Sequence, residues 1–194
     1  MSREKLIEMA LNNKKHSDAG TMEYVDSILE IPAANYYDPD IWQKEVDLIF
    51  KRTPLVLGVS KEIPNPGDYK SIDALGVPVL ISRDSKGNLN AYLNACRHRG
   101  AALVENGVGN KKRFGCPYHG WTYSEDGSLI GISSQEDFGD IDKTCKSLVR
   151  LPVLEKAGII WVILTPDSKV DMEKFLFGYD ELLGMFNLSD WHVF

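Results

Sequence analysis

Cysteine and histidine are scarce in this chain of 194 residues, which contains three of the first and four of the second. An odd, low number of cysteines does not suggest the disulfide framework of a small secreted domain. Basic residues are also in the minority, 22 against 28 acidic ones, so the net charge is −6. That balance argues against nucleic acid as the main partner, because phosphate binding requires a basic face.

Long hydrophobic runs are absent as well. No stretch approaches the ~20 apolar residues that a membrane-spanning helix needs. The first twenty residues alternate charged and apolar side chains and lack the apolar region of a signal peptide. We therefore expect a cytoplasmic protein with no membrane partner, whose 43% apolar residues suffice for a packed core.

The first 52 residues are predicted to form a helical N-terminal arm. Ser2 can cap a helix over residues 3–11, and Asp38-Pro39 is a stronger start signal, an N-cap carboxylate followed by proline. Four apolar residues then follow at helical spacing, which predicts that one face of the second helix is buried: Trp42, Val46, Ile49 and Phe50.

From residue 53 to residue 165 the pattern changes to short apolar runs separated by turn residues. Turn residues at 84–88 and 125–127 predict two hairpins, and the run 151–164 predicts two strands around Ala157-Gly158. Many short strands at regular intervals predict an antiparallel all-β unit. After Pro166 the period becomes helical again, with Asp171 as a plausible N-cap and a further turn or two before Met185.

The most informative residues form two short motifs, C-R-H-R-G at 96–100 and C-P-Y-H-G-W at 116–121. Each motif supplies one cysteine and one histidine, followed by a glycine that permits a tight loop. Two such loops can clamp a [2Fe–2S] core, with two thiolates on one iron and two imidazoles on the other. The candidate ligands are Cys96, His98, Cys116 and His119.

The same four residues fit three further kinds of site less well. They could bind one tetrahedral zinc ion, but zinc sites usually use wider pairs such as Cys-x2–4-Cys, and Cys-x-His is awkward around a single ion. They could be free cysteines and histidines that happen to lie near each other. A cysteine–histidine nucleophile pair is weaker still, because no acidic or amide group is placed to orient the histidine.

The two motifs resemble those of Rieske proteins, and more closely those of the α subunits of ring-hydroxylating Rieske oxygenases. Arginines flank His98, and the second motif continues through Trp121-Thr122-Tyr123 to Asp126-Gly127, as is usual in that subgroup. The resemblance covers roughly residues 36 to 165. It implies a mainly β, antiparallel Rieske [2Fe–2S] domain at 53–165, with a helical N-terminal arm at 1–52 and a short C-terminal helical segment at 166–194.

Respiratory Rieske proteins carry an extra cysteine in each loop, joined as a disulfide. Here Tyr118 occupies that place in the second loop, and Ala101 lies just beyond Gly100. The resemblance therefore implies an oxygenase-type or ferredoxin-like site. Stand-alone Rieske ferredoxins are shorter and lack the helical arm, and they remain the alternative within the family.

Rieske oxygenases also use a mononuclear Fe(II), bound by two histidines and one carboxylate. Besides the two candidate cluster ligands, this chain has only His16 and His192, near opposite ends, and no Asp/Glu-x-x-His-x3–4-His motif. We therefore expect this iron in a catalytic domain that the chain lacks, with residues 166–194 as the linker toward it. The apolar ending at Phe194 favours a fragment of a longer α subunit; a complete chain of this length would favour an electron carrier.

The resemblance also implies partners. A ferredoxin or reductase would donate electrons, and a neighbouring oxygenase subunit would accept them, with His119 as the ligand facing that subunit's iron through a bridging carboxylate. The chain has one dense basic run, Lys111, Lys112 and Arg113. Short basic runs are usually solvated loops, but this one could instead attract an acidic electron donor.

The remaining residues of interest are assigned smaller roles. Cys145 is expected to be a plain free thiol, and His16 and His192 to be solvated. Tyr118, Trp121 and Tyr123 could shield a cluster from water or serve only as core packing.

Overall fold

The computed structural model describes residues 2–25 and 27–191 and contains two compact units, Met1–Asp38 and Pro39–Phe194. In the first unit, helix α1 (Arg3–Ala19) begins where the Ser2 hydroxyl accepts the Lys5 N–H, and it ends at Gly20 with φ 62°. The helix is longer than the predicted 3–11, because no glycine or proline interrupts the chain before Gly20. None of its residues is buried. A single 3-10 turn, Ala33–Tyr36, follows.

The second unit begins with helix α2 (Pro39–Glu45), which passes directly into a π-helical turn, Val46–Phe50. The prediction of one buried face was wrong: Val46 is buried, but Trp42 and Ile49 are 51% and 52% exposed. The wider i→i+5 turn, seen in the Lys51 N–H bond to the Val46 carbonyl, moves later side chains off the 3.6-residue period. Trp42 packs instead against Phe50, with ring centroids 5.6 Å apart.

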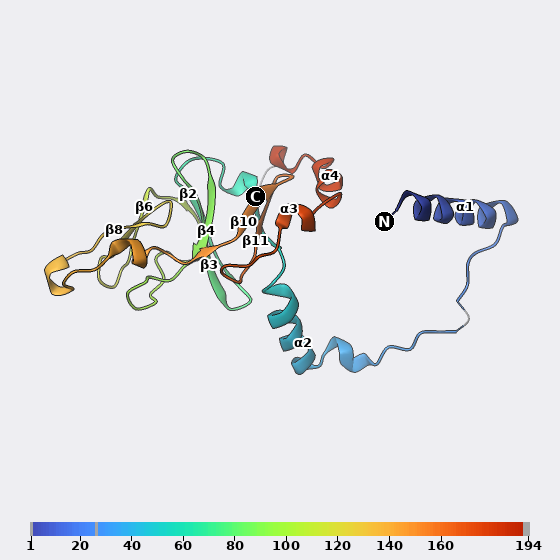
Figure 1. Cartoon of the computed structure of the whole chain (residues 1–194), viewed down its shortest axis with the longest axis horizontal. Helices are drawn as coiled ribbons and strands as arrows, with labels where there is room; N and C mark the ends of the chain where they lie inside the picture. The colour runs from blue at the N-terminus through green and yellow to red at the C-terminus, as the bar shows by residue number, and fades with distance from the viewer. Residues whose placement is uncertain (1, 26, 192–194) are drawn as a thin grey trace. The chain divides into compact units, whose positions relative to one another are not determined.

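The described part of the second unit contains three antiparallel sheets (Figure 1). The five-stranded sheet has the order β5-β2-β3-β4-β9 and consists of Gly107–Asn110, Asp68–Ala74, Val77–Arg83, Leu89–Leu93 and Arg150–Leu151. A second sheet, β1-β11-β10, consists of Leu55–Val59, Ile159–Val162 and Val153–Lys156. The third, β6-β7-β8, consists of Arg113–Gly115, Thr122–Ser124 and Leu129–Gly131.

The mainly β, antiparallel architecture is as predicted, and so are the hairpins. Strands β3 and β4 pair around 84–88, β7 and β8 around 125–127, and β10 and β11 around Ala157-Gly158. Strands β5, β6 and β9 were not predicted, because each has only two to four residues and little apolar character.

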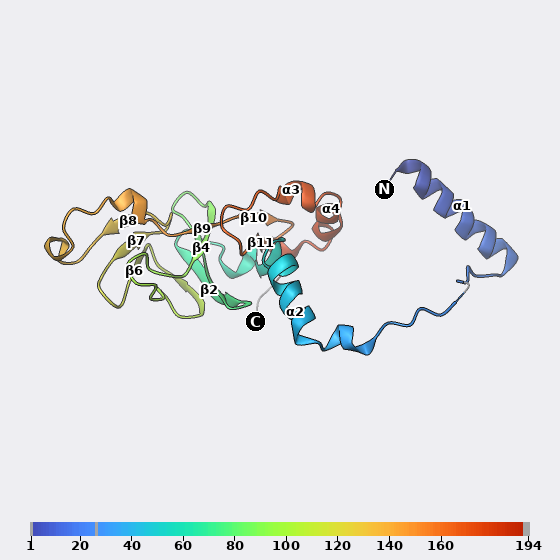
Figure 2. The same ribbon diagram turned by 60° about the horizontal axis from the view of Figure 1, so that its bottom comes forward.

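Two hydrophobic cores hold this unit together. One joins the five-stranded sheet to β1-β11-β10 and includes Ile63, Val79, Ile81, Ile160 and Val162, each fully buried. The other lies toward the β6-β7-β8 sheet and contains both Cys96 and Cys116 among aromatic and aliphatic side chains. The candidate ligands therefore stand at the edge of a packed core, at the end of the unit where β6 and β8 lie in both views (Figure 2).

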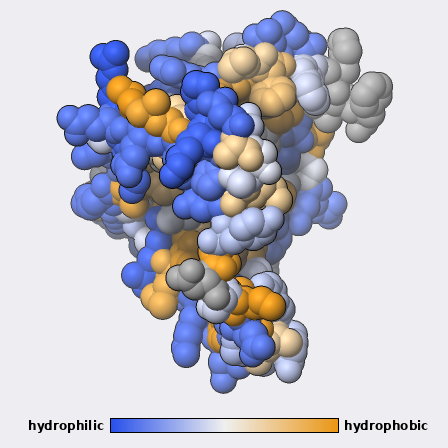
Figure 3. Space-filling view, turned by 90° about the vertical axis from the view of Figure 1, so that its right-hand side faces the viewer, coloured by the Kyte–Doolittle hydropathy of each residue, from blue (hydrophilic) through white to orange (hydrophobic). Residues whose placement is uncertain are grey.

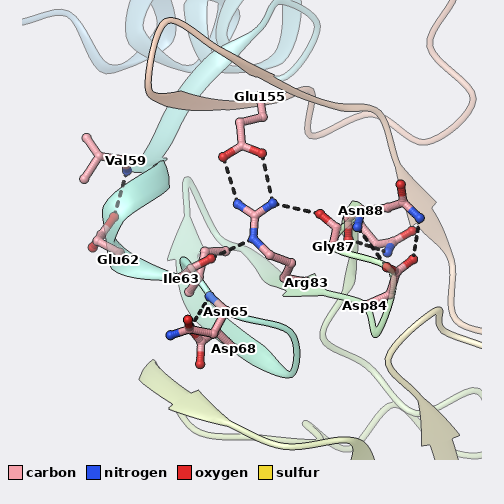
Figure 4. Close-up of polar contacts among 11 residues, drawn as sticks. Val59, Glu62, Ile63, Asn65, Asp68, Arg83, Asp84, Gly87, Asn88 and Glu155 are labelled. Atoms are coloured by element: carbon pink, nitrogen blue, oxygen red, sulfur yellow. Dashed lines mark hydrogen bonds and ion pairs between the residues drawn. The ribbon is translucent and has the colours of Figure 1, made fainter. Parts of the chain in front are cut away.

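A bidentate ion pair links the five-stranded sheet to the β1-β11-β10 sheet. The Arg83 guanidinium, on β3, donates to both carboxylate oxygens of Glu155, on β10, at 2.8 and 3.0 Å (Figure 4). The same guanidinium donates to the carbonyls of Ile63 and Gly87, so each side of its fork has a partner. These hydrogen bonds from Arg83 hold the pKa of Glu155 below its ordinary value.

Two short helices, α3 (Met172–Phe175) and α4 (Tyr179–Gly184), follow β11, and a 3-10 turn, Leu188–Asp190, comes after them. Asp171 caps α3 as predicted, its carboxylate accepting the Lys174 N–H. Lys156 anchors both helices to β10 through Glu173 and Asp180.

Hydrophobic residues on the face drawn in Figure 3 lie in patches among hydrophilic ones. No helix within the described ranges has the length and apolar character needed to cross a bilayer.

Candidate metal centre

The two candidate ligand loops have the same backbone hydrogen-bond pattern. In the first, the Cys96 N–H donates to the Ala101 carbonyl and the Gly100 N–H donates back to the Cys96 carbonyl, both at 2.8 Å. In the second, the Cys116 N–H donates to the Trp121 carbonyl at 2.7 Å, and the Gly120 N–H donates back to the Cys116 carbonyl at 3.0 Å. Both glycines adopt a left-handed conformation, with φ 77° and 66°.

The four predicted ligands come together from these two loops. The first loop follows β4, and the second connects β6 to β7. The cysteines are buried, with exposures of 3% and 5%, whereas His98 and His119 are only partly buried. The centroids of the two imidazole rings are 4.7 Å apart. The thiols are thus on the inner, buried side of the site and the imidazoles on the outer side.

This arrangement fits a [2Fe–2S] cluster. Nδ1 of His119 is buried and has no hydrogen-bond partner among the described residues, as expected of a nitrogen that ligates iron. No three histidine, cysteine or acidic side chains in the described ranges meet around one ion position. The donors instead form a thiol pair and an imidazole pair, which is the division that one mixed-ligand cluster requires.

The thiol pair lies in a dry, hydrogen-bonded environment. Burial raises the pKa of the Cys96 thiol. The contact with the Tyr123 hydroxyl lowers this pKa, and neighbouring Cys116 raises it further. Tyr123 Oη lies 3.3 Å from Cys96 Sγ and accepts the Arg97 N–H at 2.9 Å. Burial also raises the pKa of Tyr123 far above its ordinary value, so this hydroxyl keeps its proton and can donate it toward sulfur.

Aromatic rings surround the imidazole pair. Trp121 stacks on His98, with centroids 5.1 Å apart and 14° between the planes, and Phe138 meets the same ring edge-on at 5.2 Å. Tyr118 lies against His119 at 3.8 Å and accepts a hydrogen bond from Arg99. Trp121 and Tyr123 are buried and shield the site, whereas Tyr118 is 56% exposed.

A comparison with known families shows which kind of domain this is: residues 53–150 match the Rieske [2Fe-2S] domain. The chain belongs to the Rieske family. Its relatives include the large subunit of anthranilate 1,2-dioxygenase from Acinetobacter baylyi, 32% identical over 78% of this chain and 32% of that protein. Another is the oxygenase subunit of glycine betaine monooxygenase from Chromohalobacter salexigens, 31% identical over 84% of this chain and 36% of that protein.

Solved structures agree with this assignment. Naphthalene 1,2-dioxygenase from Rhodococcus sp. superposes with a TM-score of 0.74 at 33% identity, over 80% of this chain and 36% of that one. A quaternary ammonium Rieske monooxygenase superposes with a TM-score of 0.73 at 29% identity, over 80% of this chain and 43% of that one. This Rieske domain therefore resembles large oxygenase subunits, and the chain spans about a third of the length of the curated relatives it matches.

Sequence reasoning missed two residues that shape this Rieske site. Asn94 is buried and closes the first loop: its amide oxygen accepts the Leu103 N–H, and its amide nitrogen donates to the Val104 carbonyl and to Ser71 Oγ. The only signal for it is a polar residue at the end of the apolar run 89–95. Phe138 gives no signal, because its contacts with His98 and Trp121 span seventeen residues or more.

Cys145 and His16, which were also considered from the sequence, make local contacts. Cys145 is an exposed free thiol hydrogen-bonded to Asp142, as expected. His16 belongs to α1, with its Nδ1 3.0 Å from the Thr21 hydroxyl. His192 lies outside the described residues.

Proposed function

We propose that this chain is the electron-transfer domain of a ring-hydroxylating Rieske oxygenase, with Cys96, His98, Cys116 and His119 holding its [2Fe–2S] cluster. The observation that carries the proposal is the pair of matching loops, which presents two buried thiols and two adjacent imidazoles, one with an unpartnered Nδ1. When bound, such a cluster supplies a one-electron couple at roughly −150 to +300 mV.

The protein's own residues prepare that chemistry. Trp121, Tyr123 and Phe114 exclude water from the thiol side because each is almost fully buried. The Tyr123 hydroxyl offers a proton to Cys96 sulfur without losing it. The imidazoles lie at the outer side, where a partner can approach.

The route of the electron belongs to the same proposal. A ferredoxin or reductase donates it, and a mononuclear iron of a neighbouring oxygenase subunit receives it, because this chain has no histidine pair with a carboxylate to bind that iron. His119 is the proposed exit ligand. A solved relative is described in terms of inter-subunit electron transfer, which supports this direction.

Aromatic ring hydroxylation by the whole oxygenase is supported by relatives named for anthranilate, chlorobenzene, benzene and naphthalene.

The second candidate is a stand-alone ferredoxin-like carrier, favoured by the lack of the iron-binding motif in the sequence. A genomic reading frame that continues past Phe194 into such a motif would support the oxygenase, and a stop codon there would support the carrier. The division into 1–52, 53–165 and 166–194, and a cytoplasmic location, remain predictions.

The cluster itself is tested by anaerobic reconstitution of the chain with iron and sulfide. We expect two irons and two acid-labile sulfides per chain, with a rhombic EPR signal after reduction. Serine at Cys96 or Cys116, or asparagine at His98 or His119, should abolish that signal. Cys145→Ser and His16→Asn are matched controls that should retain it. A colourless protein that binds one zinc ion would refute the proposal.

A further inference from the structure

Charge is distributed very unevenly along this acidic chain. Between Cys96 and Trp121 lie five of its 22 basic residues but only one of its 28 acidic ones, Glu105. The basic residues are Arg97, Arg99, Lys111, Lys112 and Arg113, all of them exposed. The segment that carries the ligand loops is therefore a positive region on a protein of net charge −6.

The positive charge is next to a cleft. A cleft of about 650 Å³ is lined by Tyr69, Leu103, Glu105, Val108, Lys111 and Pro117, among others. Pro117 lies inside the second ligand loop, between Cys116 and Tyr118, and Leu103 closely follows the first. The cleft thus reaches both loops. Val108 is 60% exposed on one side, and the Lys111 ammonium lies 5.8 Å from the centre of the Tyr69 ring.

A second segment at the site has the opposite charge. The segment that brings Phe138 against His98 carries Glu136, Asp137 and Asp140, all exposed. An approaching acidic protein is repelled there and attracted toward Lys111–Arg113, from which β6 leads directly into Cys116. Charges arranged in this way determine the orientation of an encounter as well as its rate.

We propose that the Lys111–Arg113 strip, together with the adjoining cleft, is the docking surface for an acidic one-electron carrier protein. The inference rests on the proposed function and names the partner's chemistry and the side of its approach. In the docked complex the reduced carrier loses one electron and the cluster gains it, with no bond formed and no proton moved. Charge complementarity supports this occupant, since the strip presents three exposed positive side chains beside the exposed apolar Val108, and binding to a second copy is one of the outcomes of the test below.

The test reverses the charge of the three strip residues and compares this variant with one in which three lysines elsewhere are reversed. The variant carries Lys111→Glu, Lys112→Glu and Arg113→Glu. The control carries Lys61→Glu, Lys169→Glu and Lys174→Glu, all at exposed positions outside both ligand loops. Lys174 is on α3, which lies at the end of the unit away from β6 (Figure 1), and Lys61 lines a cleft together with Ser189. Both change the net charge by the same amount. The probe is a small acidic plant-type [2Fe–2S] ferredoxin, with its affinity measured by calorimetry and its electron-transfer rate by stopped flow.

We expect the strip variant to lose about tenfold or more in affinity and in second-order rate at low salt, and the control to lose less than about threefold. The difference should shrink as salt shortens the Debye length below about 10 Å. A variant with glutamine at all three strip positions should lie between the wild type and the reversed variant, and it remains available if the reversed variant fails to fold.

Two outcomes would overturn the docking surface. One is equal losses in the two triple variants, which would indicate net charge alone. The other is a change in self-association without a change in ferredoxin affinity, which would assign the strip to a second copy. Photoreduction by uncharged deazariboflavin separates this question from the proposed function, because it reports an intact, reducible cluster whether or not a carrier docks.

Discussion

Tyr123 Oη lies 3.3 Å from Cys96 Sγ, and this contact joins the two halves of the metal centre. Tyr123 stands on β7, just after the second loop, whereas Cys96 begins the first. Because the same oxygen accepts the Arg97 N–H, its proton is free to point toward sulfur. One side chain therefore contacts both the backbone and the thiol of the first loop and can donate toward a candidate ligand.

Removing that hydroxyl should lower the reduction potential. A donated hydrogen bond stabilises the reduced cluster, which carries more negative charge, so Tyr123→Phe should shift the potential downward, on the order of tens of mV. Tyr92→Phe is the matched control, because the Tyr92 hydroxyl is buried without a hydrogen-bond partner in the described chain. Protein-film voltammetry measures both, and equal potentials in the two variants would assign Tyr123 a packing role only.

The two loop glycines should respond differently to alanine. A Cβ at Gly100 meets nothing within 4 Å. Gly100→Ala should therefore lower the unfolding free energy only by the strain of a left-handed alanine, about 1 kcal/mol. A Cβ at Gly120 would come within 2.8 Å of Ser133 Cβ, so Gly120→Ala should also displace the second loop and reduce iron and sulfide content. Ser133→Gly should partly restore Gly120→Ala. Equal cluster occupancy in the two single variants would contradict this.

Asn94 should be needed for the first loop rather than for the sheet. Asn94→Asp keeps the shape but loses the donor to the Val104 carbonyl and places a charge at a site only 3% exposed. We expect a loss of about 2–4 kcal/mol in unfolding free energy and faster loss of iron to a chelator. Asn187→Asp, at an exposed position near the end of the described chain, is the control and should change neither measurement appreciably.

The Arg83–Glu155 pair should make stability depend on pH. The folded-state pKa of Glu155 is below its ordinary 4.5, so its contribution is complete above about pH 4.5 and is lost as pH falls through the folded value. Glu155→Gln should therefore lower the unfolding free energy at neutral pH by about 1–3 kcal/mol and weaken the acid dependence.

Urea unfolding from pH 7 to pH 3 measures this contribution. The control Asp47→Asn removes an exposed ion pair with Lys51 that solvent screens, so it should lower the unfolding free energy much less than Glu155→Gln does. A Glu155→Gln curve parallel to that of the wild type over the whole range would exclude the pair as a source of acid sensitivity.

Local sequence was sufficient to predict the hairpins and the candidate ligands. A hairpin depends on a few turn residues between two apolar runs, and each ligand loop contains its cysteine, histidine and glycine within five consecutive residues. The buried face of the helix after Pro39 was predicted wrongly, because periodicity assumes 3.6 residues per turn and Val46–Phe50 adopts a wider one.

The amino-acid sequence was therefore enough to predict the chemical groups of this protein: four candidate ligands of two kinds, an acidic chain with one basic run, and strands joined by tight turns. The surroundings of those groups became visible only with the packing of the sheets. Phe138 reaches His98, Asn94 binds the Leu103–Val104 backbone, and a cleft opens beside Lys111. Such contacts join residues separated by nine to forty positions and depend on how the sheets pack, which turn residues and periodicity do not specify.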